Sequence, residues 1–530
     1  MRERIVCVLG ILGLWAVLYL PGLGRIEMEH EEGRRALAAR EMLQSGSWIH
    51  ATVLQETYLN KPPGFSWLIL LASSLTRRVN EWSVRFPSAL ATLATALLVC
   101  SFAPEVWSAR ARFLAAALFL LTFLTSEKGR QGEIDAAFVL FVWASLRAAW
   151  CSRGPGARGA GWCISGLWLG GAFLLKGPPA LLFYYGTLLP FHYYGNRCRP
   201  WLLSRVQIWI GLGFAAVVAV WLVPLLAILG WQPLWETLVR EIGQRGASSH
   251  VFFKDHAGFI ISLAGGMLPG VLWLPAYFGR HRWKDAHSRN QEARTFLLCL
   301  LTAPLLFFLY FPGARARYMY PAAPAVACLA AWAWDRARDD LRDPFLRIPH
   351  AIFAWSAIAG GGAAAIWAGW VAWNRPSHMI FFGLMGSSAC LLTAWLGARF
   401  RDRFRFSAAV AQILALACLV LVSVQARVVK QESMHEWRDA ARRIMDAVPP
   451  GSPLYTLPWD YFGLFYYVEQ PVIHIQDLSG LPPGAGDYFV VYGANAGRSS
   501  WKQVEVTGFE PVPLPKGSMI WIIHLRKNPG

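Results

Sequence analysis

A short acidic stretch near the N-terminus carries the residue types best suited to chemistry. Residues 26–65 read IEMEHEEGRRALAAREMLQSGSWIHATVLQETYLNKPPGF, and within them Glu31 and Glu32 precede Arg34. A carboxylate just outside an apolar helix can accept a proton from a hydroxyl group, because a nearby low-dielectric surface raises its basicity. The alternative is a solvated acidic helix N-terminus, which the helix dipole favours. The pattern alone leaves both interpretations open.

Further charged residues stand at the ends of apolar runs. Asp135 enters one run after a short turn, and Lys176 precedes Gly-Pro-Pro at the end of another. Arg315 and Arg317 lie in the segment PGARARYMYP, and guanidinium groups match the geometry of phosphate oxygens. Simpler alternatives are a helix cap for Asp135 and, for Lys176, a lysine that extends to the membrane surface.

A polar loop at 230–256 adds Arg245 and two histidines. His250 and His256 are six residues apart, which does not place two metal ligands on one helix face. A divalent metal site that uses His250 is therefore left open, and surface histidines are the commoner explanation. No cofactor is assigned.

Composition indicates a protein embedded in a membrane. The chain has 530 residues, of which 55% are hydrophobic and only 15% are charged. Apolar runs of about 17–25 residues are long enough to cross a bilayer. The pattern predicts about thirteen spans, at 5–23, 86–103, 111–126, 134–150, 162–176, 178–194, 206–229, 257–277, 295–311, 318–334, 349–372, 379–397 and 408–425.

The distribution of arginine predicts the orientation. Basic residues recur in alternate short loops, and such loops face the cytoplasm under the positive-inside rule. This topology accounts for the net charge of +18 without nucleic acid as a partner. The stretch 24–85, the turn 127–133, the loop 230–256 and the C-terminal segment are then expected outside the cytoplasm.

The C-terminal segment has a different composition, which predicts a second domain. Residues 434–447 read as an amphipathic helix that ends before Pro449. Short runs rich in Val, Ile and Tyr follow, as is typical of strands, with a short helix expected near 460–467. The expected strands are 453–457, 471–475, 487–493 and 519–525. We expect a transmembrane domain at 1–425, with the outer loop 24–85 carrying the site, and a small extracytoplasmic α/β domain at 426–530.

Five segments together resemble the polytopic glycosyltransferases that use polyprenyl-phosphate sugars, namely the lipid A aminoarabinose transferases and their protein O-mannosyltransferase relatives. The resemblance covers about residues 1–335, in order through EEGRRALAAREMLQSGSWIHATV, TYLNKPPGFSWLI, NEWSVRFPSALATLATALLV, FLLKGPPALL and RYMYPAAPAVACLAAW. It implies a GT-C fold in the bacterial inner membrane, with a site that faces the periplasm. It also implies transfer of one sugar from a lipid phosphate donor to a lipid, protein or glycan acceptor.

The resemblance also implies roles for individual residues. Glu31 takes the position of the family's catalytic Asp, Glu32 that of its neighbouring Glu, and Asp135 that of the second-loop acid. The residues expected to hold the lipid phosphate or other parts of the substrates are Arg34, Lys61, Lys176, Arg245, Arg315, Arg317 and Tyr318.

The sequence departs from the family pattern at two positions, and two other functions are considered as alternatives. Glu31 is one methylene longer than Asp, and Asn60 stands where relatives often have a Glu that helps to hold a metal. A lipid-linked sugar transporter or flippase is the main alternative function, and it predicts ionisable residues in mid-span and internal repeats. A structural membrane protein with a sensory outer domain is a third interpretation, and it leaves the outer acids and cations unexplained.

Overall fold

The computed structural model divides the chain into two compact units. Unit 1 comprises Met1–Gly22 and Ser88–Arg427, and unit 2 comprises Leu23–Pro87 and Val428–Gly530. The structure describes residues 2–28, 30–102, 107–153, 159–194, 201–246, 252–278, 288–310, 314–337, 436–457, 461–476, 486–493, 505–514 and 519–527, and the single residues 348, 352, 417 and 481. Each unit is described by itself below.

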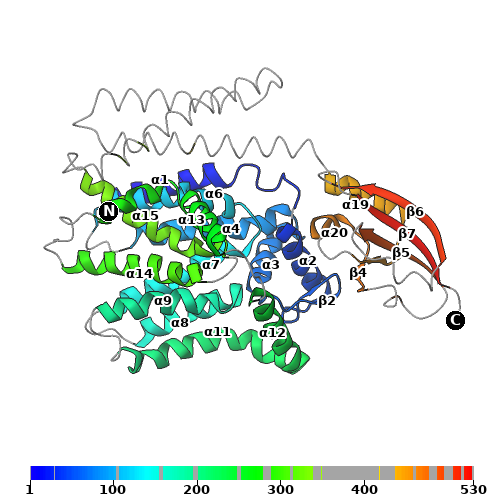
Figure 1. Ribbon diagram of the computed structural model, residues 1–530, viewed down its shortest axis with the longest axis horizontal. Helices are drawn as coiled ribbons and strands as arrows, with labels where there is room; N and C mark the ends of the chain where they lie inside the picture. Colours follow the sequence, from blue (N-terminus) through cyan, green and yellow to red (C-terminus); the bar gives the residue numbers. More distant parts are fainter. Residues whose placement is uncertain are drawn as a thin grey trace, which may run out of the picture. The chain divides into compact units, whose positions relative to one another are not determined.

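Unit 1 is helical in its described part (Figure 1). α4 (Glu81–Cys100) begins in unit 2 and continues into unit 1. The other helices of unit 1, with two 3₁₀ segments (η1, η2), are α1 (Arg2–Tyr19), α5 (Ala109–Leu121), α6 (Phe123–Lys128), α7 (Ile134–Cys151), α8 (Gly159–Lys176), α9 (Pro179–Tyr194), α11 (Val206–Leu229), α12 (Gln232–Gly246), α13 (Phe252–Gly266), η1 (Gly270–Phe278), α14 (Ser288–Tyr310), η2 (Ala316–Ala322) and α15 (Ala323–Ala337).

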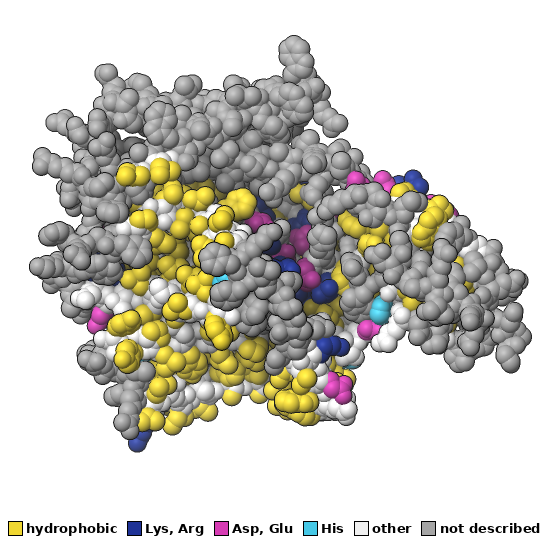
Figure 2. All heavy atoms as spheres, viewed as in Figure 1, with side chains coloured by type: hydrophobic (Ala, Val, Ile, Leu, Met, Phe, Trp, Pro, Cys, Tyr) yellow, Lys and Arg dark blue, Asp and Glu magenta, His cyan; other side chains and the backbone are white. Residues whose placement is uncertain are grey.

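The surface of these helices is apolar, as expected for contact with lipid. Figure 2 shows hydrophobic side chains spread over the visible face of the helical unit. On α11, Ile208, Leu212, Val220 and Val223 are all exposed. Four of the described helices are long and apolar enough to cross a membrane, namely Glu81–Cys100, Ile134–Cys151, Val206–Leu229 and Asn290–Tyr310.

Small residues let α8 and α11 approach closely. A Cβ added to Gly166 would lie 2.1 Å from the Ile210 carbonyl oxygen, and one added to Gly213 would lie 2.2 Å from that of Cys163. Only glycine fits at such a contact, and lipid-embedded helices commonly use small residues in this way.

The described helices match most of the predicted spans in position but interrupt three of them. The span expected at 318–334 begins as the 3₁₀ segment η2 and continues as α15. The span expected at 111–126 is divided at Thr122 into α5 and α6, and the Phe123 amide donates to the Leu268 carbonyl at 2.9 Å. The span expected at 257–277 ends as the 3₁₀ segment η1, because Pro269 and Pro275 lack the amide donors that a continuous α-helix needs. The number of spans is not confirmed, since 349–372, 379–397 and 408–425 fall almost wholly outside the described residues.

Unit 2 combines the acidic stretch with the C-terminal α/β segment. Its N-terminal part contains α2 (His30–Ser45), the hairpin strands β1 (Thr52–Val53) and β2 (Glu56–Thr57), and α3 (Gly64–Thr76). Its C-terminal part contains α19 (Glu436–Ala447), β3 (Leu454–Thr456), α20 (Phe462–Tyr467), β4 (Val472–His474), β5 (Gly486–Gly493), β6 (Glu505–Pro513) and β7 (Met519–Lys527). The division predicted at residue 425 stays a prediction.

A five-stranded sheet, in the order β4-β3-β5-β7-β6, forms the core of the C-terminal part (Figure 1). β3 pairs in parallel with β4 and β5, whereas β7 pairs antiparallel with β5 and β6. The predicted helices and four of the strands are confirmed, but the prediction missed β6. Pro511 and Pro513 lie in β6 and argue against a strand, yet proline is tolerated there because β6 is at the sheet edge.

α2 packs against α20 through two glycines. A Cβ added to Gly33 would lie 2.6 Å from the backbone of Phe462 and Gly463, and one added to Gly463 would lie 2.6 Å from the Met28 carbonyl oxygen. Two backbones therefore meet without side chains between them, at the first turn of α2. This contact joins the acidic stretch to the C-terminal part of unit 2.

Substitution of Gly33 tests this packing. Gly33→Ala is expected to destabilise the protein by about 1–3 kcal/mol, because the methyl group overlaps backbone that has no rotamer to change. Thermal unfolding in detergent measures the effect as a lower midpoint. Gly211→Ala is the matched control, since nothing lies within 4 Å of the added Cβ in α11. Equal midpoints for both variants would contradict the close contact.

Candidate active site

Helix α2 presents Glu31 on its first turn. The Glu31 carboxylate lies 3.1 Å from Arg34 Nη1 and 3.1 Å from Arg35 Nη2, and its side chain is 34% exposed. Arg35 also donates to the Tyr58 hydroxyl at 2.5 Å. The Glu31 carboxylate is therefore accessible, and two guanidinium groups orient it.

Glu32 has a different environment, although it is the next residue. Its side chain is buried, and Arg85 of α4 contacts both of its oxygens. Arg85 Nε donates to Oε1 at 2.9 Å and Nη2 donates to Oε2 at 2.7 Å. A bidentate pair of this kind holds the carboxylate in one orientation. The two adjacent acids therefore differ in access: Glu31 reaches solvent and Glu32 does not.

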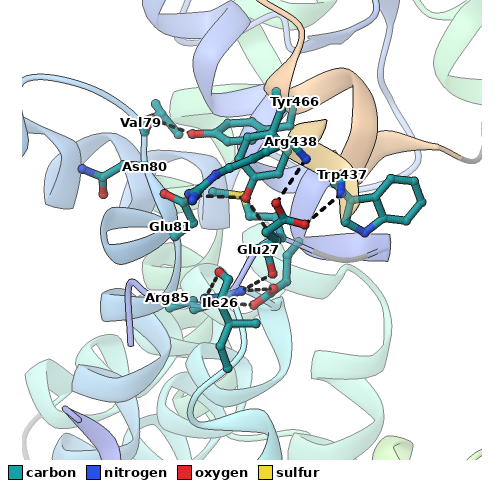
Figure 3. Close-up of polar contacts among 12 residues, drawn as sticks. Ile26, Glu27, Val79, Asn80, Glu81, Arg85, Trp437, Arg438 and Tyr466 are labelled. Carbon is teal, nitrogen blue, oxygen red and sulfur yellow. Dashed lines mark hydrogen bonds and ion pairs between the residues drawn. The ribbon is translucent and has the colours of Figure 1, made fainter. Parts of the chain in front are cut away.

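Glu27 connects the acidic stretch to the start of α19 (Figure 3). Its carboxylate accepts hydrogen bonds from the backbone amides of Trp437 at 2.9 Å and Arg438 at 3.1 Å. The first amides of a helix have no partners within the helix, so an acid at this position caps α19. Arg438 in turn contacts Glu81, which also accepts a hydrogen bond from the Tyr467 hydroxyl at 2.9 Å.

A second charged cluster lies in unit 1, where several helices begin or end. Asp135, in the first turn of α7, forms an ion pair with Lys176, the last residue of α8. Lys176 Nζ also lies 5.2 Å from the ring centroid of Phe138 and 5.8 Å from that of Tyr318. The lysine is thus held by one carboxylate and two aromatic faces.

Glu133 is the second acid of this cluster. Its Oε2 atom lies 3.4 Å from Lys128 Nζ and 3.5 Å from Arg317 Nη1. Burial raises the pKa of Glu133 to about 6, and the nearby Asp135 carboxylate acts in the same direction, while Lys128 and Arg317 oppose the shift. The pKa of this carboxyl group therefore lies above its ordinary value, although a cation lies on either side.

The turn that carries Glu133 is anchored to two neighbouring helices. Arg130 donates to the Leu18 carbonyl at 2.6 Å and also to the Pro21 carbonyl, both near the end of α1. Ser88 Oγ of α4 donates to the Glu133 carbonyl at 3.0 Å. These contacts hold the turn, and with it the backbone of Glu133, against α1 and α4.

The structure brings some of the predicted site residues together within each unit. In unit 1, Asp135, Lys176 and Tyr318 meet around the lysine, and Arg317 joins them through Glu133. Arg315 precedes η2 and is exposed. The roles predicted for these residues stay predictions.

In unit 2, Glu31 and Arg34 are paired, and Lys61 is half-buried in the loop between β2 and α3. The side chain of Arg245, in α12, is not among those described, and His250 lies outside the described residues. Among the residues that the structure describes, no group of three or more His, Cys, Asp or Glu side chains could hold a metal ion.

Sequence reasoning missed Lys128, Glu133 and Arg85. The first two belong to the turn that leads to Asp135, where two acids and a lysine within eight residues were the available signal. Arg85 stands directly before the span expected at 86–103, and a charge at that boundary looks like an ordinary membrane flank. Its partner Glu32 is 53 residues away in the sequence, so no local pattern reveals the pair.

Comparison with known proteins shows which proteins this chain is similar to. The family model for dolichyl-phosphate-mannose-protein mannosyltransferase matches residues 60–231. Two similar relatives are undecaprenyl phosphate-alpha-4-amino-4-deoxy-L-arabinose arabinosyl transferases, from Pectobacterium atrosepticum and Pseudomonas fluorescens. The Pectobacterium protein is 31% identical over 67% of this chain and 63% of its own length. The Pseudomonas protein is 29% identical over 62% of this chain and 60% of its own length. The alignments thus span a little under two thirds of these relatives.

The fold extends the likeness to nearly the whole chain. The crystal structure of ArnT from Cupriavidus metallidurans bound to undecaprenyl phosphate superposes with a TM-score of 0.72, at 18% identity, over 98% of this chain and 97% of that one. This likeness shows a shared GT-C fold with a small sheet domain, and with it an integral membrane protein. Taken with the relatives and the family model, the chain has the GT-C fold and is similar to the aminoarabinose transferases.

Proposed function

We propose that this chain is a glycosyltransferase that moves a single sugar from a polyprenyl-phosphate donor, of the undecaprenyl-phosphate type, to a lipid A-like lipid, a protein or a glycan. The observation that carries the proposal is the cluster in which Glu133 and Asp135 hold Lys128, Lys176 and Arg317. Fixed cations at the ends of lipid-facing helices suit a phosphate that is attached to an isoprenoid chain. The relatives' names and the undecaprenyl phosphate in the ArnT structure support the same donor class.

We propose that the chemistry takes place on the periplasmic side of the bacterial inner membrane, where the domain 426–530 would also lie. The alternation of basic loops supports this orientation, since short arginine-rich loops stay in the cytoplasm. A donor sugar on a lipid carrier also fits a compartment without nucleotide sugars.

The proposed reaction is a single displacement at the anomeric carbon of the donor sugar. The acceptor oxygen forms a bond to that carbon as the bond from the carbon to the phosphate oxygen breaks. The hydroxyl proton passes to a carboxylate, a role we assign to Glu31 because it is accessible and Glu32 is not. The lipid phosphate leaves with one more negative charge, and Lys128, Lys176 and Arg317 stabilise that charge.

A direct assay tests the activity. The purified chain in lipid nanodiscs is incubated with radiolabelled undecaprenyl-phosphate-linked sugars and with lipid A, and the labelled acceptor is separated by thin-layer chromatography. We expect label on the acceptor and free undecaprenyl phosphate in equal amounts. If no polyprenyl-phosphate sugar yields a labelled lipid, peptide or glycan, the proposal fails.

The assignment of Glu31 as the base predicts a specific loss. Glu31→Gln keeps the size and the hydrogen-bond acceptor but not the basic oxygen, so kcat should fall by at least about 100-fold. The KM for the donor should stay nearly constant, because the variant keeps Lys128, Lys176 and Arg317, to which we assign the donor phosphate. Asp439→Asn, on an exposed ion pair of α19, is the control and should retain activity. Full turnover in the Glu31 variant would exclude the assigned role.

Loss of one phosphate-binding cation should affect donor use. Arg317→Gln is expected to reduce kcat/KM for the donor by about 10- to 100-fold, because one charge-assisted contact to the leaving group is removed. Initial rates at varied donor concentration measure the change. Arg110→Gln, an exposed arginine at the start of α5, is the matched control. Equal effects of the two substitutions would count against a specific phosphate site.

The raised pKa of Glu133 predicts how donor affinity depends on pH. Below a pH of about 6 the carboxyl group is protonated, so Lys128 and Arg317 lose a negative neighbour and the cluster gains one positive charge. A phosphodiester donor keeps one negative charge across this range. We therefore expect the donor KM to fall several-fold from pH 7.5 to pH 5. In Glu133→Gln the KM should be low and independent of pH, and a KM that rises on acidification in the wild type would disprove the effect.

A further inference from the structure

We propose that Arg85 is a positioning residue, which holds the loop between α1 and α2 in one conformation and thereby fixes the position of Glu31. This inference rests on the proposed function, since it concerns the geometry of the assigned base. Arg85 itself is buried and contacts the loop rather than a substrate.

The guanidinium group of Arg85 uses all three of its nitrogens on the loop and on α2. Nη1 donates to the carbonyls of Leu23 at 3.0 Å and Ile26 at 2.8 Å. Nη2 donates to the Glu27 carbonyl at 3.0 Å and to Glu32, and Nε donates to Glu32. An arginine has five N–H groups in a fixed planar fork, and here every one has an acceptor.

These contacts matter because residues 20–28 contain turns and bends but no helix or strand. Buried carbonyls in such a segment need donors from outside the segment. Arg85, on α4, supplies three of them. Figure 3 shows its side chain directed at Ile26 and Glu27.

Glu27 receives a second restraint from the opposite direction. Its side chain caps α19 through the amides of Trp437 and Arg438, while its carbonyl accepts from Arg85. The loop is therefore held by α4 on one side and by the start of α19 on the other. Because Glu31 lies in the first turn of α2, we infer that the same contacts set the position of its backbone, while Arg34 and Arg35 orient its carboxylate.

Only an arginine can provide this set of contacts. A lysine at position 85 keeps the charge but has one nitrogen, which cannot reach three carbonyls and both oxygens of Glu32. A displaced general base loses much of its effect, since a shift of about 1 Å can lower the rate by about 100-fold.

The test compares Arg85→Lys with Arg40→Lys in nanodiscs. Arg40 is a matched control, because its guanidinium group also donates to two backbone carbonyls in unit 2, those of Tyr466 at 2.7 Å and Phe465 at 3.3 Å. For Arg85→Lys we expect kcat to fall at least about 10-fold while the donor KM changes less than about twofold. For Arg40→Lys we expect both constants to stay within about twofold of the wild type.

Hydrogen exchange followed by mass spectrometry provides a readout that does not need activity. In Arg85→Lys, the amides of residues 23–32 should exchange faster, while those of β5 and β7 should not change. Unchanged exchange in 23–32, or a donor KM that rises as much as kcat falls, would overturn the inference. If the wild type transferred no sugar, the proposed function would fail, and faster loop exchange would still establish the structural part of the positioning role.

A second variant covers the case in which Arg85→Lys does not fold. Arg85→Met with Glu32→Leu replaces the buried ion pair by apolar side chains, an exchange that folded proteins often tolerate. The loop carbonyls then lack their donor. We expect a folded protein with fast exchange in 23–32 and at least about a 10-fold loss in kcat. Wild-type turnover in this double variant would show that Arg85 does not position the base.

Discussion

Every charge that this protein buries beside its apolar helices requires a partner, and the structure depends on how these partners are arranged. An isolated ion in a low-dielectric surrounding is costly, whereas a paired and hydrogen-bonded one is tolerated. Asp135 meets Lys176 where α7 begins and α8 ends, and Glu32 meets Arg85 at the start of α4. The first pair joins two consecutive helices through residues 41 positions apart, and the second joins residues 53 positions apart. The pairs thus fix helix ends as well as neutralise charge.

The same arrangement suits the phosphate chemistry that we propose. Cations that carboxylates already hold do not have to be ordered when an anion arrives, so they stabilise developing charge with little reorganisation. In unit 1, protonation of Glu133 would add one positive charge to the cluster that it forms with Lys128 and Arg317. In unit 2 two adjacent glutamates are separated into an accessible carboxylate and a buried structural one. Similar residues acquire different roles from their surroundings.

Much of the fold could be predicted from local pattern. The helix at 434–447 was evident from its amphipathic spacing and from the prolines that follow it, and α19 confirms it. β6 was not predicted, because two prolines and a glycine argue against a strand. Such a strand is tolerated here because β6 lies at the sheet edge. The break at Thr122 was also hidden, since residues 111–126 are apolar throughout and the interruption is stabilised by a hydrogen bond to Leu268, far along the chain.

The sequence by itself determined that the protein belongs in a membrane, because its apolar runs are long enough to cross one. The acids and cations at the ends of those runs indicated where we propose that its chemistry takes place. Lys176 and Asp135 were both recognisable as unusual charges at helix ends. Only the tertiary structure decided which charged residues form ion pairs. Glu32 pairs with Arg85, and Glu27 caps a helix more than 400 residues later in the sequence. The physical reason is that hydrophobic pattern is a property of neighbouring residues, whereas an ion pair depends on the distance between side chains that packing alone brings together.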